Sequence, residues 1–224
     1  MSQKSKNKSQ ATLAGEPFSL HNSKFLVPRL RFPEFRDAGA WNAKKLSQVC
    51  EVNPSVCSLP EAFVYIDLES VEEGKLFQKR IISREGAPSR AQRLLKRGDV
   101  IFQTVRPYQK NNYFFLPDDD IDYVASTGYA QLRAHESNKY LFQYLHNDRF
   151  VGRVLEKCTG SNYPAINSSD LSAIMVEVPE PNEQQKIADF LSSLDGLIAA
   201  QSEKLDALKT HKKGLMQQLF PSEN

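Results

Sequence analysis

The chain has 224 residues, of which 40% are hydrophobic and 25% charged, and its formal net charge is +2. This size allows one core of about 150 residues together with one extended element. No apolar run approaches the roughly 18 residues that a membrane-spanning helix needs, which excludes a transmembrane chain.

The amino-terminal segment and the cysteines indicate where the protein resides. Residues 1–24 favour a disordered leader, because Met1–Gln10 is rich in Lys, Ser, Asn and Gln and no apolar signal-peptide segment follows. Cys50, Cys57 and Cys158 are an odd number without C-x-x-C spacing, which indicates reduced thiols rather than disulfides or a zinc site. We therefore expect a cytoplasmic protein without a metal site.

A compact domain of mixed α and β structure is predicted next. Trp41–Val49 is typical of a short helix, and alternation predicts a strand at Phe63–Leu68. Pro88–Leu95 favours a helix after a proline start, and Gly98-Asp99 favours a tight turn. The remaining predicted elements are strands at Val100–Val105, Tyr113–Leu116, Tyr123–Ala125 and Gln131–Ala134, a helix from Ser137 or Asn138 to Lys157, a loop at Gly160–Pro164 and a strand at Leu171–Val178.

Positive charge is concentrated between Lys75 and Lys110. This segment holds ten basic residues and only two acidic ones, Glu85 and Asp99, which gives a local balance of +8. Ser, Gln, Thr, Tyr and Asn side chains, which read base edges or hold phosphates, are mixed into it. The combination indicates duplex DNA as the ligand. Taken alone, the run of basic residues is equally consistent with an ordinary solvated surface that binds no DNA.

Signatures of catalysis are absent from the sequence. It contains no G-x-G-x-x-G, Walker or H-E-x-x-H motif, and its four histidines are scattered. Pro117-Asp118 is not followed by the Glu-x-Lys or Asp-x-Lys of a nuclease site. We therefore expect a non-catalytic chain that carries no cofactor of its own.

The carboxy-terminal stretch carries the strongest pattern in the chain, an unbroken 4, 3, 4, 3 spacing typical of a coiled-coil seam. We predict a helix over residues 181–221, with Asn182 as N-cap and Gln185 completing a capping box. The seam consists of Ile187, Leu191, Leu194, Ile198, Gln201, Leu205, Leu208, Lys212, Leu215 and Leu219. We expect a partner helix to cover it, and the alternative is a helix folded back on its own domain.

Short motifs follow one another along nearly the whole chain after the leader. They are Pro28–Phe35 followed by Trp41 and Leu46, then Ser89-Arg90-Ala91, Gly98–Ile101, Arg106-Pro107, Ser126–Tyr129 and Gly160–Asn167. The tail continues with Glu183-Gln184, Lys186–Ala188, Phe190-Leu191, Leu194-Asp195 and Lys213–Pro221. As an ordered set, these motifs resemble the specificity subunit of type I restriction-modification systems.

The resemblance implies an α+β (mixed α/β) target recognition domain over residues 25–180, which binds DNA, followed by one long coiled-coil helix over 181–221. Subunits of this family carry two such domains, each reading half of a bipartite site, and two long antiparallel helices that space the domains. This chain has one domain and one helix. We therefore expect a half-length form that acts as a homodimer on an interrupted palindrome.

The resemblance also implies partners. They are double-stranded DNA and a type I methyltransferase subunit, with S-adenosylmethionine bound to that subunit and not to this chain. Whether a restriction subunit joins is left open. A complex of this kind is expected in the cytoplasm of a bacterium or an archaeon.

The residues expected to contact DNA share a polar, cationic or aromatic side chain in the basic segment or in two later motifs. They are Arg84, Ser89, Arg90, Gln92, Arg93, Gln103, Thr104, Arg106, Tyr108, Lys110, Ser126, Thr127, Ser161, Asn162 and Tyr163. Arginine and glutamine form bidentate contacts with guanine and adenine, whereas lysine mostly contacts phosphate.

Two other functions remain open on the sequence. In the first alternative, the chain is a truncated specificity fragment that acts only as a protein interaction module. In the second, it is a metal-dependent nuclease that uses Asp118, Asp120 and Asp122. The first would bind DNA weakly and without sequence preference. The second would cleave DNA when a divalent metal is present.

Overall fold

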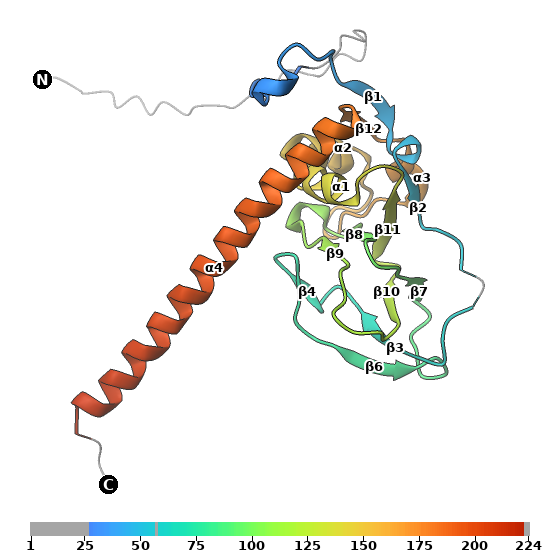
Figure 1. The fold of residues 1–224 in the computed structure, drawn as a ribbon. Helices are drawn as coiled ribbons and strands as arrows, with labels where there is room; N and C mark the ends of the chain where they lie inside the picture. Colours follow the sequence, from blue (N-terminus) through green and yellow to red (C-terminus); the bar gives the residue numbers. More distant parts are fainter. Residues whose placement is uncertain (1–26, 57, 222–224) are drawn as a thin grey trace, which may run out of the picture.

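Helix α4, Pro181–Leu219, leaves a mixed α/β body and extends well beyond it (Figure 1). The computed structural model describes residues 27–56 and 58–221. The predicted leader over residues 1–24 and Cys57 lie outside the described residues. A mixed α/β body followed by one long helix confirms that part of the predicted fold class, and the coiled coil stays a prediction.

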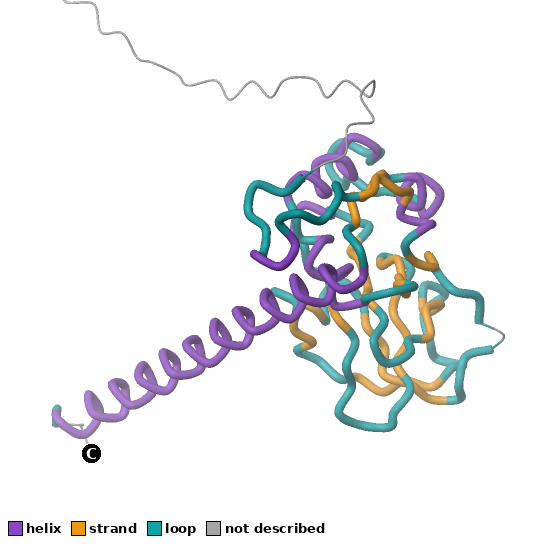
Figure 2. The backbone as a smooth tube through the Cα atoms, turned by 45° about the horizontal axis from the view of Figure 1, so that its top comes forward, coloured by secondary structure: helices purple, strands orange, loops and turns teal. Residues whose placement is uncertain are grey.

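Most strands of the body, drawn in orange in Figure 2, belong to two four-stranded sheets. Their strands are β2 Cys50–Val52, β3 Ala62–Ile66, β6 Arg80–Ser83, β7 Ala91–Leu94, β8 Val100–Gln103, β9 Tyr113–Phe114, β10 Tyr123–Ser126 and β11 Tyr129–Ala134. One sheet has the order β6-β3-β10-β7, in which β10 runs parallel to β3 and antiparallel to β7. The other sheet is antiparallel, with the order β2-β11-β8-β9.

Two short strand pairs and several helices complete the body. The pairs are β1 Asn42–Lys45 with β12 Met175–Val178, and β4 Val71–Glu72 with β5 Lys75–Leu76. The helices are α1 Asn138–Leu145, α2 Asp148–Lys157 and α3 Ser168–Ala173, with 3-10 turns η1 Pro33–Phe35, η2 Leu46–Gln48 and η3 Pro107–Gln109. Within the described residues, no helix is long and apolar enough to cross a bilayer.

Strand β8 separates the two main parts of the core. Val100 and Phe102 belong to the apolar cluster that contains α1 and α2, whereas Ile101 belongs to the cluster shared with β3 and β10. Successive side chains of a strand point to opposite faces, so a strand covered on both faces is apolar along most of its length. All four residues of β8 are buried.

Several predicted strands are confirmed. Strands β3, β8, β9, β10 and β11 lie within or overlap the segments 63–68, 100–105, 113–116, 123–125 and 131–134. The predicted turn before β8 is confirmed as well, because Gly98 adopts a φ of 93°, in the left-handed region that favours glycine.

Two predicted helices in the body are wrong. Trp41–Val49 contains β1 and the 3-10 turn η2, and β1 pairs with β12 near the other end of the body. Pro88–Leu95 contains β7, which pairs with β10. In both segments, pairing with a strand distant in the sequence outweighs local helical preference.

Two further predictions are wrong in their boundaries. The helix predicted to run from Ser137 or Asn138 to Lys157 divides into α1 and α2, because the Asn147 side chain accepts a hydrogen bond from the Arg149 amide at 2.8 Å and starts a second helix. The strand predicted at 171–178 is shorter, since the Asn167 side chain caps α3 over its first half.

Helix α4 starts differently from the prediction. Pro181 occupies its first position, and Glu180 is the N-cap residue without a side-chain cap. The Gln185 amide donates to Asp189 at 2.8 Å, so the predicted capping box is wrong. Proline suits the first helical position because it has no N–H to satisfy there.

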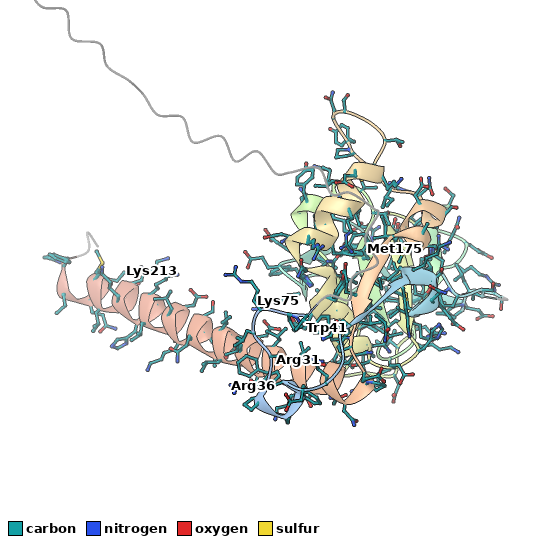
Figure 3. The ribbon with its side chains drawn as sticks, turned by 90° about the horizontal axis from the view of Figure 1, so that it is seen from above. Arg31, Arg36, Trp41, Lys75, Met175 and Lys213 are labelled. Atoms are coloured by element: carbon teal, nitrogen blue, oxygen red, sulfur yellow. The ribbon has the colours of Figure 1, made fainter. Side chains whose placement is uncertain are left out.

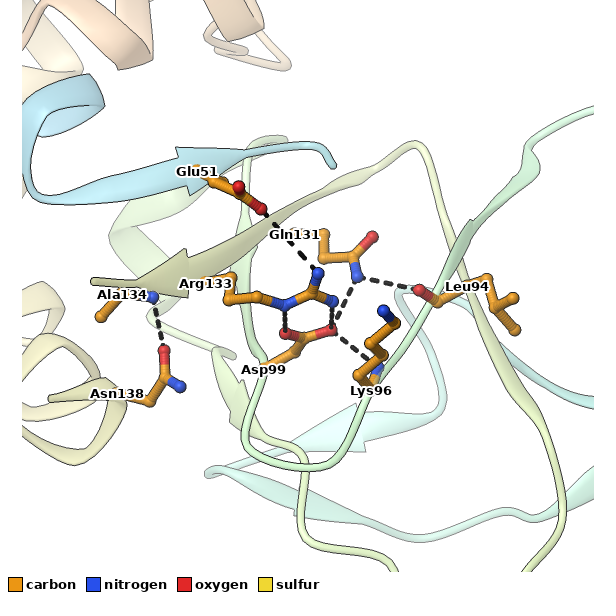
Figure 4. Close-up of polar contacts among 8 residues, drawn as sticks. All are labelled: Glu51, Leu94, Lys96, Asp99, Gln131, Arg133, Ala134 and Asn138. Carbon is orange, nitrogen blue, oxygen red and sulfur yellow. Dashed lines mark hydrogen bonds and ion pairs between the residues drawn. The ribbon is translucent and has the colours of Figure 1, made fainter. Parts of the chain in front are cut away.

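A buried carboxylate joins the two sheets. Asp99, only 1% exposed, accepts hydrogen bonds from Arg133 at 2.8 and 2.9 Å, from the Gln131 amide at 2.7 Å and from the Lys96 backbone at 2.7 Å (Figure 4). The Gln131 amide also donates to the Leu94 carbonyl oxygen at 2.8 Å. β7, β8 and β11 are thereby tied at one point.

We predict that Asp99→Asn lowers the free energy of unfolding by about 3 kcal/mol, because Arg133 and Gln131 lose a charged acceptor. Urea denaturation near neutral pH measures the change. Asp120→Asn, at an exposed acid, is the matched control and should change stability by less than about 0.5 kcal/mol. Equal stabilities for the two variants would contradict the prediction.

A second buried carboxylate lies just before α4. Burial raises the pKa of Glu177, but hydrogen bonds from Arg153 and Tyr144 outweigh burial, and the pKa falls below the usual value. The Glu177 amide also donates to the Tyr144 hydroxyl at 3.0 Å. This cluster joins α1, α2 and β12. A carboxylate whose pKa is lowered in the folded state stabilises the fold above its unfolded pKa.

We predict that Glu177→Gln costs about 2–3 kcal/mol near neutral pH, because it removes one charge of a buried pair. As the pH falls below the unfolded carboxyl pKa of about 4.3 and then through the lower pKa of the folded state, the wild-type advantage is progressively lost. The difference in unfolding free energy between variant and wild type should therefore shrink toward zero in acid. Glu156→Gln on the exposed side of α2 is the control, and a difference that does not change with pH would contradict the prediction.

Candidate nucleic-acid interface

Four segments that are far apart in the sequence meet on one surface through main-chain hydrogen bonds. The Thr127 amide donates to the Arg90 carbonyl oxygen at 2.8 Å, and the Thr104 amide donates to the Gly128 oxygen at 3.0 Å. The Ile166 amide donates to the Thr104 oxygen at 3.1 Å. We call this the four-segment surface, and it comprises residues 89–93, 103–110, 126–128 and 160–166.

The η3 turn of this surface is held in an uncommon backbone shape. Arg106 and Lys110, on either side of it, have φ values of 54° and 55°, in the left-handed region that residues other than glycine rarely adopt. The Arg106 amide donates to the Pro164 oxygen at 2.7 Å, which fixes the turn against the fourth segment. Such conformations persist where the surroundings determine them and are common at functional sites.

Gln103 braces the same turn from within. Its side-chain amide donates to the Val105 oxygen at 2.7 Å and to the Gln109 side chain at 2.8 Å, and its carbonyl oxygen accepts from the Asn111 amide at 3.2 Å. The Gln103 side chain is therefore fully engaged inside the domain. Its role in the structure is to shape the loop that carries Tyr108.

An arginine and a tyrosine from different segments stack on this surface. The Arg106 guanidinium lies 5.0 Å from the centre of the Tyr163 ring, within the range of a cation–π contact. Tyr163 is 66% exposed and Tyr108 is 50% exposed. Exposed aromatic rings can stack on bases, and guanidinium groups beside them can bind phosphates.

The structure brings most of the sequence-predicted contact residues onto the four-segment surface. Those that are exposed there are Ser89, Arg90, Gln92, Tyr108, Ser161, Asn162 and Tyr163, and those that are partly exposed are Arg93, Arg106, Lys110 and Thr127. Burial lowers the pKa of the Arg93 guanidinium. Lys110 forms an ion pair with Asp148, so part of its charge is already neutralised within the domain.

Three predicted contact residues are buried instead. They are Gln103, Thr104 and Ser126. The Thr104 hydroxyl donates to the Gly128 oxygen at 2.8 Å, and the Ser126 hydroxyl accepts from the Gly128 amide at 3.2 Å. These side chains brace the surface. A base could not reach them without breaking those contacts.

Arg84 lies apart from the four main-chain segments. It is exposed in the loop between β6 and β7, and its guanidinium donates to the Leu59 oxygen at 3.1 Å. The same loop leads into Ser89 and Arg90, so Arg84 flanks the four-segment surface.

Sequence reasoning missed the loop 67–70, which packs beneath the Thr127-Gly128 turn. A Cβ atom on Gly128 would lie 3.0 Å from the Leu68 side chain, so any larger residue here would require Leu68 to shift. Asp67 accepts hydrogen bonds from the Ser70 hydroxyl at 2.6 Å and the Glu69 amide at 3.1 Å. The Asp-x-x-Ser spacing was the signal that could have identified this turn.

The acidic residues of the alternative nuclease site are partly engaged. Lys79 donates to Asp118 at 2.7 Å and to Asp119 at 3.0 Å, and these hydrogen bonds lower the pKa of both carboxyl groups. Asp120 and Asp122 are exposed. Among the described residues, no three His, Cys, Asp or Glu side chains are placed to hold a metal ion.

The second candidate surface is the seam of α4. Ile187 and Leu191 are partly buried at its base, whereas the apolar seam residues from Leu194 onward are exposed, up to 75% at Leu219. The helix projects away from the body along this part (Figure 1). Large exposed apolar side chains in a continuous row mark an interaction surface.

Comparison with known proteins identifies the family of the chain. A family model described as the type I restriction modification DNA specificity domain matches residues 39–210, which is more than half of the chain. The HindI specificity subunit of Haemophilus influenzae is 23% identical over 162 residues, covering 70% of this chain and 35% of that protein. The MjaVIII specificity subunit of Methanocaldococcus jannaschii is 23% identical over 192 residues, covering 80% and 45%.

Solved structures agree with this match. The HsdS subunit from Thermoanaerobacter tengcongensis has a TM-score of 0.60 and 28% identity, covering 82% of this chain and 51% of that one. A chain from a study of the assembly and conformational transition of the type I R-M system has a TM-score of 0.61 and 26% identity, covering 82% and 50%. The chain thus spans about half the length of these relatives or less. Its recognition motifs, fold and family match agree, and the chain belongs to the type I restriction-modification DNA specificity family.

Proposed function

We propose that this chain is the sequence-specific DNA recognition subunit of a type I restriction-modification complex and that it reads one half of a bipartite site. The observation that carries the proposal is the four-segment surface, where separate polar, cationic and aromatic motifs meet. Membership of a family named for DNA specificity supports it. In this role the chain is not itself catalytic.

The side chains of the surface divide by chemistry. Arg90 carries paired N–H donors that suit guanine, and Gln92 offers adenine one donor and one acceptor, although its amide also donates to the Ser89 oxygen at 2.7 Å. The exposed hydroxyl of Ser161 suits phosphate. The Arg106–Tyr163 stack supplies a flat face for contacts with bases or sugars. Because η3 is braced by Gln103, little order has to be gained when DNA binds.

A homodimer through α4 would supply the second half-site reader. The proposal rests on the exposed seam, since a coiled coil buries such a row against a partner helix. Two identical domains related by a twofold axis would read an interrupted palindrome, with half-sites separated on the order of 34 Å. Gln201 and Lys212 would set the register, as buried polar seam residues do.

The family suggests the remaining partners. We propose that a type I methyltransferase subunit docks on the dimer and carries S-adenosylmethionine, and that this chain binds no cofactor itself. The alternatives are a non-catalytic interaction module, supported by the exposed seam alone, and a nuclease built on the acidic residues near Asp118.

We predict that Arg90→Ala weakens binding to the preferred DNA by about 1–3 kcal/mol and relaxes the preference at one base position, because a bidentate base contact is lost. Selection from random duplexes, followed by binding to single-base variants, measures both effects. Arg97→Ala is the matched control, since Arg97 belongs to the same basic run but donates to the Pro117 oxygen outside the four-segment surface.

The same measurements distinguish the proposed function from its alternatives. Arg97→Ala should weaken binding to all sequences slightly and alike. Binding by the wild type without any base preference would favour the interaction module, and metal-dependent cleavage of the duplex would favour the nuclease. An unchanged base preference in Arg90→Ala would exclude Arg90 as a reader.

We predict that the purified chain is a dimer, with a molar mass of twice 25.4 kDa by light scattering. Leu205→Glu should give a monomer, because it places a charge in the middle of the seam. Glu203→Ala, at an exposed position outside the seam, should remain a dimer. A wild-type monomer, even with the methyltransferase subunit present, would contradict the symmetric arrangement.

A further inference from the structure

A short segment before β1 crosses the base of α4. We call residues 31–38 the strap. Arg31 donates from Nε and Nη2 to the two carboxylate oxygens of Glu183, at 2.7 and 2.6 Å, and from Nη1 to the Ala38 oxygen at 2.7 Å. The side chains of Arg31 and Glu183 are only 6% and 2% exposed. Figure 3 shows Arg31 beside α4 where the helix leaves the body.

Further contacts continue along the same side of the helix. Phe32 packs edge-on against Phe190, with ring centres 5.5 Å apart. Lys186 pairs with Glu34 at 3.0 Å and lies 5.5 Å from the centre of the Phe32 ring. Positions 183, 186 and 190 follow helical spacing, so the strap contacts one face over two turns.

Another face of the base is held by α1. The Gln143 side chain donates to Asp195 at 2.6 Å, and Lys139 lies 3.8 Å from Asp189. Among the described residues, these are the hydrogen bonds and ion pairs that reach furthest along α4 from the body. The helix is therefore fixed between the strap and α1 up to Asp195 and projects beyond it.

This arrangement makes the base of the helix a lever. From Asp195 to Leu219 the free part extends on the order of 36 Å at about 1.5 Å per residue. A tilt of roughly 10° at the base would move its end by about 6 Å, which is close to 2 base pairs of duplex at about 3.4 Å each. A small change in the angle of α4 at its base would thus move its far end by a distance comparable to the spacing of base pairs.

We propose that Arg31 is a positioning residue that fixes the angle of α4 and thereby sets the spacer length between the two half-sites. The inference rests on the proposed DNA-reading dimer. It names the residue that determines the distance between the two half-sites that the dimer reads. A bidentate guanidinium–carboxylate pair suits this task, because its planar fork fixes orientation as well as distance. Lysine would keep the charge but lose the fork.

The first test measures spacing directly. Wild-type chain, Arg31→Lys and the control Arg36→Lys are each offered duplexes with the two selected half-sites held at a series of spacer lengths. Arg36 is exposed in the same strap. Wild type and Arg36→Lys should prefer one length. With Arg31→Lys, the affinity for duplexes whose spacer differs by about 1–2 base pairs should rise to within about tenfold of the affinity for the preferred length. The preferred half-site bases should stay the same.

A second measurement does not depend on DNA. Spin labels carried by non-natural residues at Asp120 in the body and Lys209 on the free helix report the angle as a distance distribution. This distribution should broaden in Arg31→Lys and not in Arg36→Lys. Lys186→Gln, which removes an exposed strap contact without touching the buried pair, should broaden it less.

The outcomes separate the two proposals. A wild-type chain that selects no two-part target overturns the proposed function, and the label distances then still decide whether Arg31 fixes the helix. A folded Arg31→Lys chain with an unchanged spacer preference or an unchanged distance distribution overturns the inference. A change in half-site bases would also overturn it, since a positioning residue leaves base readout intact. If Arg31→Lys fails to fold, the same two readouts are made on Glu183→Gln, which keeps the shape of the Glu183 side chain but removes the carboxylate that Arg31 holds, and unchanged readouts in that variant overturn the inference.

Discussion

The two-residue turn Thr127-Gly128 is the constraint on which the body depends. It joins β10, an inner strand of one sheet, to β11, an inner strand of the other, so both sheets are placed by one short connection. The same turn accepts hydrogen bonds from Thr104 and donates to Arg90. A Cβ atom on Gly128 would crowd the Leu68 side chain, so a larger residue in this turn would require Leu68 to move. The candidate interface is therefore a consequence of how the two sheets are joined.

Elements buried on both faces were predictable, and elements fixed by distant partners were not. Strand β8 appears in the sequence as a continuous apolar run after a Gly-Asp turn, and these local signals suffice. Ala91–Leu94 has no such pattern, and its strand forms because β10 lies beside it. The helical seam is likewise visible in sequence because its period is local, but whether anything covers it depends on a second molecule.

The candidate site shows the same limit at the level of single side chains. Sequence identifies Gln103 and Arg90 alike as able to read bases, since chemistry is a property of the residue type. Orientation is a property of the fold, and it places Gln103 inside, bonded to its own loop, while Arg90 remains outside. A glutamine within a strand buried on both faces has to satisfy its amide internally, so strand burial is the signal that distinguishes bracing from contact.

Buried and exposed charged residues have different roles in this molecule. The buried ion pairs hold the helix base, and the exposed basic residues are available to anions. The ionic contacts around α4 and its preceding strand, at Glu177 and Glu183, are buried, and salt screens buried pairs weakly. The arginines and lysines of the basic run are mostly exposed, where salt acts strongly and where exchange with phosphate is easy. The geometry of the body and helix base therefore persists under conditions in which contacts with a charged polymer form and break.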